Sequence, residues 1–273
     1  MAEPALEALL RRERAIVVAA LLVLAALAWA YVVWLAHLMD MGGMDMSGYR
    51  MVPSGALLML PALQPWSVAE FALVFVMWAV MMVGMMLPSA APMLLIYARV
   101  GRQAASRGRS FAAAAWFLAG YLLAWSGFAL IATLAQWALD RAALLSARMT
   151  ATSGILGGLV LIAAGLYQWT TLKDACLREC RAPFAFIQQH GGFRGDVGGA
   201  LRLGLGHGVW CVGCCWSLMV LLFVGGVMNV LWIAALSILV LLEKVLPVGR
   251  AIARAAGLAL LLAGAWLLLR ATL

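Results

Sequence analysis

Charged side chains are scarce in this chain of 273 residues: only 11% are charged, whereas 66% are hydrophobic. Soluble domains average about a quarter charged residues, so the composition excludes a soluble enzyme and indicates an integral membrane protein. The chain also has no Walker motif, so any transport is not driven by its own ATP hydrolysis. Carboxylates do not recur along the centres of the apolar stretches, which weakens a proton-pump interpretation. No catalytic motif is found, and we favour a binding or transport role over an enzyme.

Seven apolar stretches are each about long enough to cross a bilayer, which takes ~20 residues as a helix. They predict an all-α fold, a polytopic helix bundle with spans at Ala15–Leu38, Val68–Ile96, Phe111–Leu139, Ser153–Thr170, Leu203–Val224, Val227–Leu246 and Ala253–Leu269. The first span has 24 residues and follows Arg11, Arg12 and Arg14. It exceeds the ~7–15 residues of a signal-peptide core, so we interpret it as a retained signal anchor.

The basic residues predict the orientation of these spans. With the N-terminus in the cytoplasm, 15 of the 19 Lys and Arg residues fall on the cytoplasmic side. This bias is typical of inner-membrane proteins and also explains the net charge of +8 without nucleic acid as a partner. We expect one membrane domain over residues 1–273 in the bacterial inner membrane, with the C-terminus periplasmic. Its parts are the anchor 15–38, an outer loop 39–66, a core 66–250 and a last span 253–269.

Soft metal ligands are concentrated in the fifth span. His207, Cys211, Cys214 and Cys215 lie within nine residues. Because a helix turns 100° per residue, Cys211 and Cys214 share a face with His207, and Cys215 lies at its shoulder. Thiols and imidazole are ligands that transition metals prefer, so this pattern predicts a metal site. Haem attachment is not indicated, since no Cys-x-x-Cys-His sequence occurs.

A second cysteine pair, Cys176 and Cys180, follows the fourth span on the cytoplasmic side. The spacing of four residues puts both on one helix face, and Pro183 is expected to end that helix. Lys173, Arg178 and Arg181 are close in sequence and should favour the thiolates. The spacing differs from a zinc Cys-x-x-Cys motif, so a soft-metal pair and a redox pair both stay open.

Methionines form a stripe along the second span. Met77, Met81 and Met85 recur every four residues, with Met82 and Met86 in the adjacent row. Thioethers are neutral, soft ligands suited to Cu(I), although such a stripe also packs well as plain core. Met219 extends the ligand set of the fifth span. Pro88 and Pro92 are expected to kink or break the second span.

A methionine- and aspartate-rich tract lies in the predicted outer loop. Five methionines, two aspartates and one histidine occur within 15 residues. We expect this tract to collect metal on the oxidising side, where thiols would oxidise. The predicted ligands are His37, Met39, Asp40, Met41, Met44, Asp45 and Met46. A flexible glycine-rich loop with incidental methionine is the alternative.

Two further features concern the helix ends and helix contacts. Glu243 and Lys244 end the sixth span near the inner surface, where we expect snorkelling or a local ion pair. Gly154 with Gly158, and Gly204 with Gly208, have the small-xxx-small spacing that lets membrane helices approach closely.

Several motifs occur in the order found in a known family: Met77-Trp78 through Met85-Met86-Leu87-Pro88, Tyr167-Gln168 through Cys176 and Cys180, Gly206-His207 through Cys211-Val212-Gly213-Cys214-Cys215-Trp216, and Glu243-Lys244. Over roughly residues 66–250 the chain resembles a bacterial family of predicted metal-binding integral membrane proteins, a domain without an established reaction. The resemblance implies metal binding, with copper as the usual suggestion. The first span and its methionine tract lie outside it.

The leading hypothesis is therefore copper handling, as a transporter or a metallochaperone-like protein that uses Met, Cys and His ligands for Cu(I). Another soft transition metal remains a candidate. Two alternatives stay open: a membrane redox enzyme with a thiol pair or bound cofactor, and an accessory subunit of a larger membrane complex. The expected partners are membrane lipid and a metal ion, with other membrane subunits or a copper chaperone as further candidates.

Overall fold

The computed structural model describes residues 3–40, 49–54, 58–63, 66–105, 107, 112, 114–145, 149–151, 153–193 and 195–272. Most of these residues are helical, as predicted. The helices are α1 (Glu3–Asp40), α2 (Val68–Ala105), α3 (Ala114–Arg141), α4 (Gly154–Tyr167), α5 (Thr171–Arg181), α6 (Pro183–Gln189), α7 (Val197–Val220), α8 (Leu222–Gly225), α9 (Val230–Val245) and α10 (Gly249–Thr272). One addition to the all-α prediction is an antiparallel hairpin, β1 (Tyr49–Ser54) and β2 (Leu58–Leu63), within the predicted outer loop.

Each of the seven predicted apolar stretches forms a helix, but not all are long enough to count as spans. In the described part of the chain, five helices are long and apolar enough to cross a membrane, and a sixth candidate arises if α4 and α5 are one bent span. Helix α9 has 16 residues and is about 24 Å long, shorter than a ~30 Å hydrocarbon core. The structure thus supports five or six candidate spans, and the count of seven stays a prediction.

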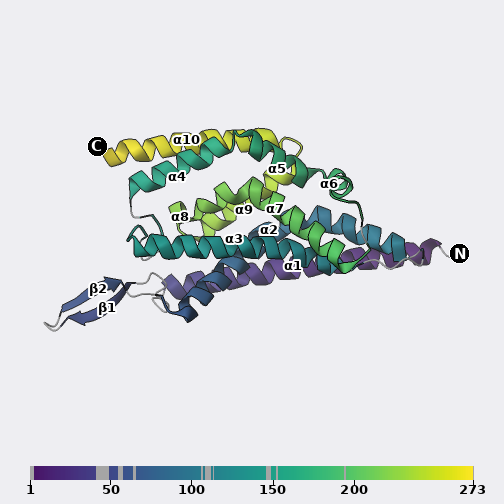
Figure 1. Ribbon diagram of the computed structural model, residues 1–273, viewed down its shortest axis with the longest axis horizontal. Helices are drawn as coiled ribbons and strands as arrows, with labels where there is room; N and C mark the ends of the chain where they lie inside the picture. The colour runs from purple at the N-terminus through teal and green to yellow at the C-terminus, as the bar shows by residue number, and fades with distance from the viewer. Residues whose placement is uncertain are drawn as a thin grey trace.

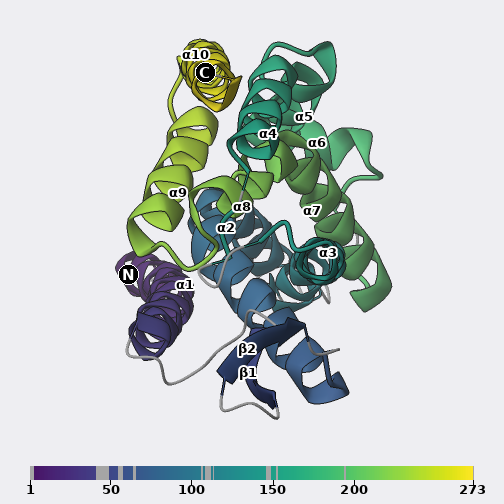
Figure 2. The same ribbon diagram turned by 90° about the vertical axis from the view of Figure 1, so that its left-hand side faces the viewer.

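The long helices α1, α2, α3 and α10 run roughly along the long axis of the molecule (Figure 1). The two termini lie at opposite ends. Helices α5 and α6 lie toward the N-terminal end, and the β1–β2 hairpin lies at the end that holds the C-terminus. Viewed along this axis, α2 lies between α1 and α9 on one side and α3 and α7 on the other (Figure 2). The contacts of α2 therefore form the centre of the bundle.

Small residues allow the closest helix contacts, as the glycine spacing predicts. A Cβ at Gly204 would overlap the Phe117 carbonyl group, and a Cβ at Gly208 would overlap the Ala124 side chain. Helix α7 thereby packs directly on the backbone of α3. Gly158 makes the same kind of contact between α4 and α10. The α3–α7 contact sets the position of the α7 cysteines.

Helix α2 remains one helix through Pro88 and Pro92, so of the expected kink or break there is no break, and the kink stays a prediction. Pro88 has no N–H to donate to the Gly84 carbonyl one turn earlier. The Trp29 indole of α1 donates to that carbonyl instead, at 3.3 Å. A neighbouring helix thus satisfies the backbone group that proline leaves free.

The chain bends sharply between α4 and α5, by 63°. Thr170 caps the new helix, because its hydroxyl accepts a hydrogen bond from the Lys173 backbone N–H at 3.2 Å. The bend directs α5 back against α7 and α9. Consequently the side chains of α5 reach the cysteines of α7, which a straight continuation of α4 would not allow.

Candidate metal centre

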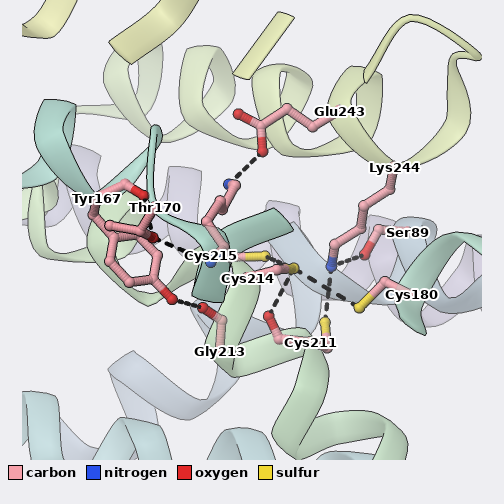
Figure 3. A network of polar contacts seen from close by, with 11 residues as sticks. Ser89, Tyr167, Thr170, Cys180, Cys211, Gly213, Cys214, Cys215, Glu243 and Lys244 are labelled. Atoms are coloured by element: carbon pink, nitrogen blue, oxygen red, sulfur yellow. Dashed lines mark hydrogen bonds and ion pairs between the residues drawn. The ribbon is translucent and has the colours of Figure 1, made fainter. Parts of the chain in front are cut away.

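Cys211 lies where four helices meet. The Lys244 ammonium of α9 donates to the Cys211 Sγ atom at 2.8 Å and to the Ser89 hydroxyl of α2 at 3.2 Å. The Tyr121 hydroxyl of α3 is 3.0 Å from the same sulfur and also donates to the Met86 carbonyl. Figure 3 shows Lys244 reaching from α9 toward Cys211 and Ser89. An ammonium this close to a thiol favours the thiolate, the form that binds metal.

Three more thiols adjoin Cys211. The Cys214 Sγ atom lies 3.1 Å from Cys215 Sγ and 3.8 Å from Cys180 Sγ (Figure 3). Cys211 in turn interacts with both Cys180 and Cys215. All four are free cysteines, and the three on α7 are at most 1% exposed. We call Cys180, Cys211, Cys214 and Cys215 the thiol cluster; it joins α5 to α7.

A buried ion pair borders the thiol cluster. Lys173 Nζ of α5 lies 2.6 Å from a Glu243 carboxylate oxygen of α9, and their side chains are 0% and 1% exposed. Glu243 therefore forms the local ion pair that the sequence suggested, but with Lys173. Lys244 does not snorkel outward; it points to the thiols. Three cations were expected to favour the α5 thiolates: Lys173, Arg178 and Arg181. Of these, Lys173 is paired with Glu243, and Arg181 donates to the Leu246 and Pro247 carbonyls.

Cys176 lies beside the thiol cluster without a sulfur–sulfur hydrogen bond to it among the described residues. Its sulfur packs on Gly213, where a Cβ would approach it to 2.9 Å. The Tyr167 hydroxyl donates to the Gly213 carbonyl at 2.5 Å. Gly213 is thus the point at which the α4–α5 bend fits against α7. This contact gives Cys176 a packing role and separates it from Cys180.

His207 is buried one turn before Cys211, in a box of aromatic rings. The ring centroids of Phe186, Tyr121 and Phe117 lie 5.2, 5.8 and 6.0 Å from its own. Its Nδ1 atom has no hydrogen-bond partner in the part of the chain that the structure describes. The structure therefore places His207 next to the thiol cluster without bonding it to a sulfur.

The predicted methionine ligands of α2 are all interior. The exposed fractions of their side chains are 0–2% for Met77, Met81, Met82, Met85 and Met86. Met219 of α7 is equally buried. For most of the outer methionine and aspartate tract, the predicted ligands lie outside the described residues. These are Met41, Met44, Asp45 and Met46, together with the side chains of Met39 and Asp40. His37 is exposed near the end of α1.

The thiols are packed against one another. Within the described ranges, no group of three or more His, Cys, Asp or Glu side chains is arranged to hold one metal ion. Two sulfurs fit a metal better. With a metal–sulfur bond of about 2.3 Å, two sulfurs on one ion lie at most ~4.6 Å apart. The 3.8 Å between Cys180 and Cys214 meets that limit.

Comparison with protein families matches residues 75–267 to PpoB2, a family described as "Copper chaperone". The chain belongs to this family. Searches of curated proteins and of solved structures each found no match. The matched region runs from α2 into α10 and contains the thiol cluster, while α1 and the outer methionine tract precede it. Membership of the PpoB2 family supports copper handling.

Several polar residues of this centre were not predicted from the sequence. Tyr121 and Ser89 look like ordinary residues of apolar helices, and nothing in their spacing separates them from packing residues. Lys173 and Glu243 are 70 residues apart, so their pairing has no local signal. A lysine next to an acidic residue at a helix end, as in Glu243-Lys244, was the one available sign of a buried cation.

Proposed function

We propose that this PpoB2-family protein is a membrane-embedded copper chaperone that holds one Cu(I) ion between two thiolates of the thiol cluster. The observation that carries the proposal is a cluster of four thiols, one of which accepts a hydrogen bond from a buried ammonium. Cys180 and Cys214 are the first pair, since their separation suits a shared ion. Cu(I) is the soft ion for which thiolates and thioethers select.

Charge balance supports a site with two thiolates. One Cu(I) with two thiolates carries a net charge of −1, and a buried charge is tolerated only when it is paired. Lys244 supplies the opposite charge and interacts with all four thiols. Lys173, also buried in the part of the chain that the structure describes, is already paired with Glu243. A third thiolate on the ion would leave one negative charge without a partner.

The methionine stripe gives copper a route to this site through the bundle. Trp78 of α2 donates to Gln136 of α3, and eight residues further along α2 the Met86 carbonyl accepts from Tyr121. This stretch is about 12 Å long and contains the buried Met81, Met82, Met85 and Met86. Thioethers bind Cu(I) more weakly than thiolates, so copper can move along them without being trapped.

A membrane location agrees with the exterior of the bundle. Five candidate spans carry large exposed apolar side chains, among them Leu27, Leu123, Val209 and Leu262. Exposed apolar surface of this extent suits lipid. The termini at opposite ends of the bundle favour an odd number of passes, as in the predicted topology with a cytoplasmic N-terminus (Figure 1).

The test is copper retention by the purified protein. The wild-type chain and Cys214→Ser are loaded with Cu(I) in detergent under reducing conditions, competed with a chromophoric Cu(I) chelator, and measured by elemental analysis. We expect one tightly held copper per wild-type chain and none in Cys214→Ser, because Cys214 contacts both Cys180 and Cys215.

Cys176→Ser is the matched control. It removes a buried thiol from α5, the same helix as Cys180, but that sulfur packs on Gly213. Copper retention should equal that of the wild type. The ligand assignment would be wrong if Cys214→Ser kept its copper, or if Cys176→Ser lost it to the same extent.

A further inference from the structure

A second region without an assigned role lies at the other end of α3, around Asp140. The Asp140 side chain is 2% exposed, and neither carboxylate oxygen has a hydrogen-bond partner among the described residues. A buried carboxylate without a partner is costly, so native proteins usually pair it or give it a metal ion. Asp140 is therefore a candidate cation ligand.

The buried thioether of Met149, close to Asp140, accepts a hydrogen bond from the Gln136 side chain. Gln136 is one turn before Asp140 on the same face of α3. Its amide oxygen accepts from the Trp78 indole at 2.8 Å, and its amide nitrogen donates to the Met149 sulfur at 3.2 Å. A thioether is a weak acceptor for an amide. The contact nevertheless fixes the Met149 sulfur beside the face that carries Asp140.

The backbone at Met149 is strained. Its φ is +55°, in the left-handed region that residues other than glycine seldom occupy, while its side chain is fully buried. Such strain persists where the surroundings fix it, and it is frequent at ligand sites. The short bridge between Leu145 and Ala151 and the bond from Ala151 N–H to the Phe223 carbonyl hold this segment against α8.

We propose that Asp140 and Met149 form a second site for Cu(I), at the end of the bundle opposite the thiol cluster. A carboxylate and one Cu(I) are together neutral, which removes the cost of the buried charge. The thioether selects a soft ion over Na⁺ or K⁺, which prefer oxygen ligands alone. Gln136 is the positioning residue for Met149. This inference rests on the proposed copper function and adds a site with weaker ligands.

The position of the Asp140 site fits a place where copper enters or leaves the bundle. Asp140 and Tyr121 are 19 residues apart on α3, or about 28 Å, close to the thickness of a hydrocarbon core. Trp78, which donates to Gln136, is within the row of methionines that continues to Met86. The methionine stripe, which contacts α3 at Gln136 and at Tyr121, thus lies between the two sites.

The test is a Cu(I) titration of the full chain against two chelators of different strength, so that tight and weak binding are counted separately. We expect wild type to bind a tight and a weaker equivalent. Asp140→Asn/Met149→Leu should lose the weaker one and keep the tight one. Asp174→Asn is the control, since Asp174 is a half-buried carboxylate paired with Arg250 near the thiol cluster's end of the bundle.

Failure of this inference is distinguishable from failure of the copper function. Tight binding by wild type, with the weaker equivalent absent or unchanged in the double variant, overturns the Asp140 site alone. If wild type bound neither the tight nor the weaker copper equivalent, the proposed function itself would be wrong.

The single variant Asp140→Asn separates loss of copper binding from loss of folding. Its thermal midpoint without copper should equal or exceed that of wild type, because a buried charge is removed, and its rise on adding Cu(I) should be smaller. A midpoint that depends on K⁺ or Na⁺ through Asp140, in place of Cu(I), would show that the ion class is wrong.

Discussion

The two ends of the buried face of α3 differ in how charge is balanced. Near Tyr121, the thiol cluster faces Lys244, and the neighbouring Glu243 is paired with Lys173. Near Asp140, the structure describes a carboxylate and a thioether but no cation in hydrogen-bond contact with that carboxylate. In the first region the buried charges have partners within the protein, whereas Asp140 would gain one only by binding a cation. We infer that the first stores copper and the second exchanges it.

The largest effect is expected when the thiol region is given an unpaired buried carboxylate, like the one near Asp140. Lys173→Met leaves Glu243 buried and alone, as Asp140 is. We expect a loss of about 3–5 kcal/mol in the free energy of unfolding, the usual result of removing one partner of a buried ion pair. Denaturation of the purified protein in detergent measures it.

The double variant Lys173→Met/Glu243→Gln is the control for that loss. It removes both charges and should recover most of the stability, since no unpaired ion remains. If the free energy of unfolding of Lys173→Met stayed within about 1 kcal/mol of the wild-type value, the pair would contribute no more to stability than an exposed salt bridge.

A smaller effect is expected from removing the cation that faces the thiols. Lys244→Met leaves a copper bis-thiolate without an opposite charge, so its affinity for Cu(I) should fall about 10- to 100-fold, or about 1.4–2.7 kcal/mol. Chelator competition measures the change. Arg250→Gln removes a nearby cation that pairs with Asp174 on the surface, and it should leave the affinity unchanged. Equal binding by Lys244→Met and wild type would contradict the charge-balance argument.

The sequence predicted the helices and the shared face of the α7 cysteines well, for a physical reason. Both depend on the helical period and on long apolar runs, which are local properties. The burial of Met77 to Met86 follows from the same period. The close contact at Gly204 and Gly208 was also foreseeable, because only small residues let two helix backbones meet.

The polar partners could not be predicted, because they depend on how the helices are placed in space. A lysine near a helix end can extend to the surface or fold inward, and only the packing of α9 on α2 sends Lys244 toward Ser89 and Cys211. The 63° bend before α5 brings Cys180 to Cys214, 34 residues away. Asp140, one residue beyond the end of its predicted span, gave no sign of burial.

The smallest expected effect comes from removing a tyrosine hydroxyl. It compares Tyr121, whose hydroxyl contacts a thiol, with Tyr167, whose hydroxyl contacts only a backbone carbonyl. Tyr121→Phe removes a hydroxyl that touches both the Cys211 sulfur and the Met86 carbonyl. Hydrogen bonds between membrane helices contribute about 0.6 kcal/mol on average, so Cu(I) affinity should fall about threefold. Tyr167→Phe removes a hydroxyl that donates to the Gly213 carbonyl, and it should lower the thermal midpoint without changing the affinity. If both variants changed the affinity equally, the effect would come from loosened packing of α7, and Tyr121 would have no direct part in holding the Cys211 thiolate.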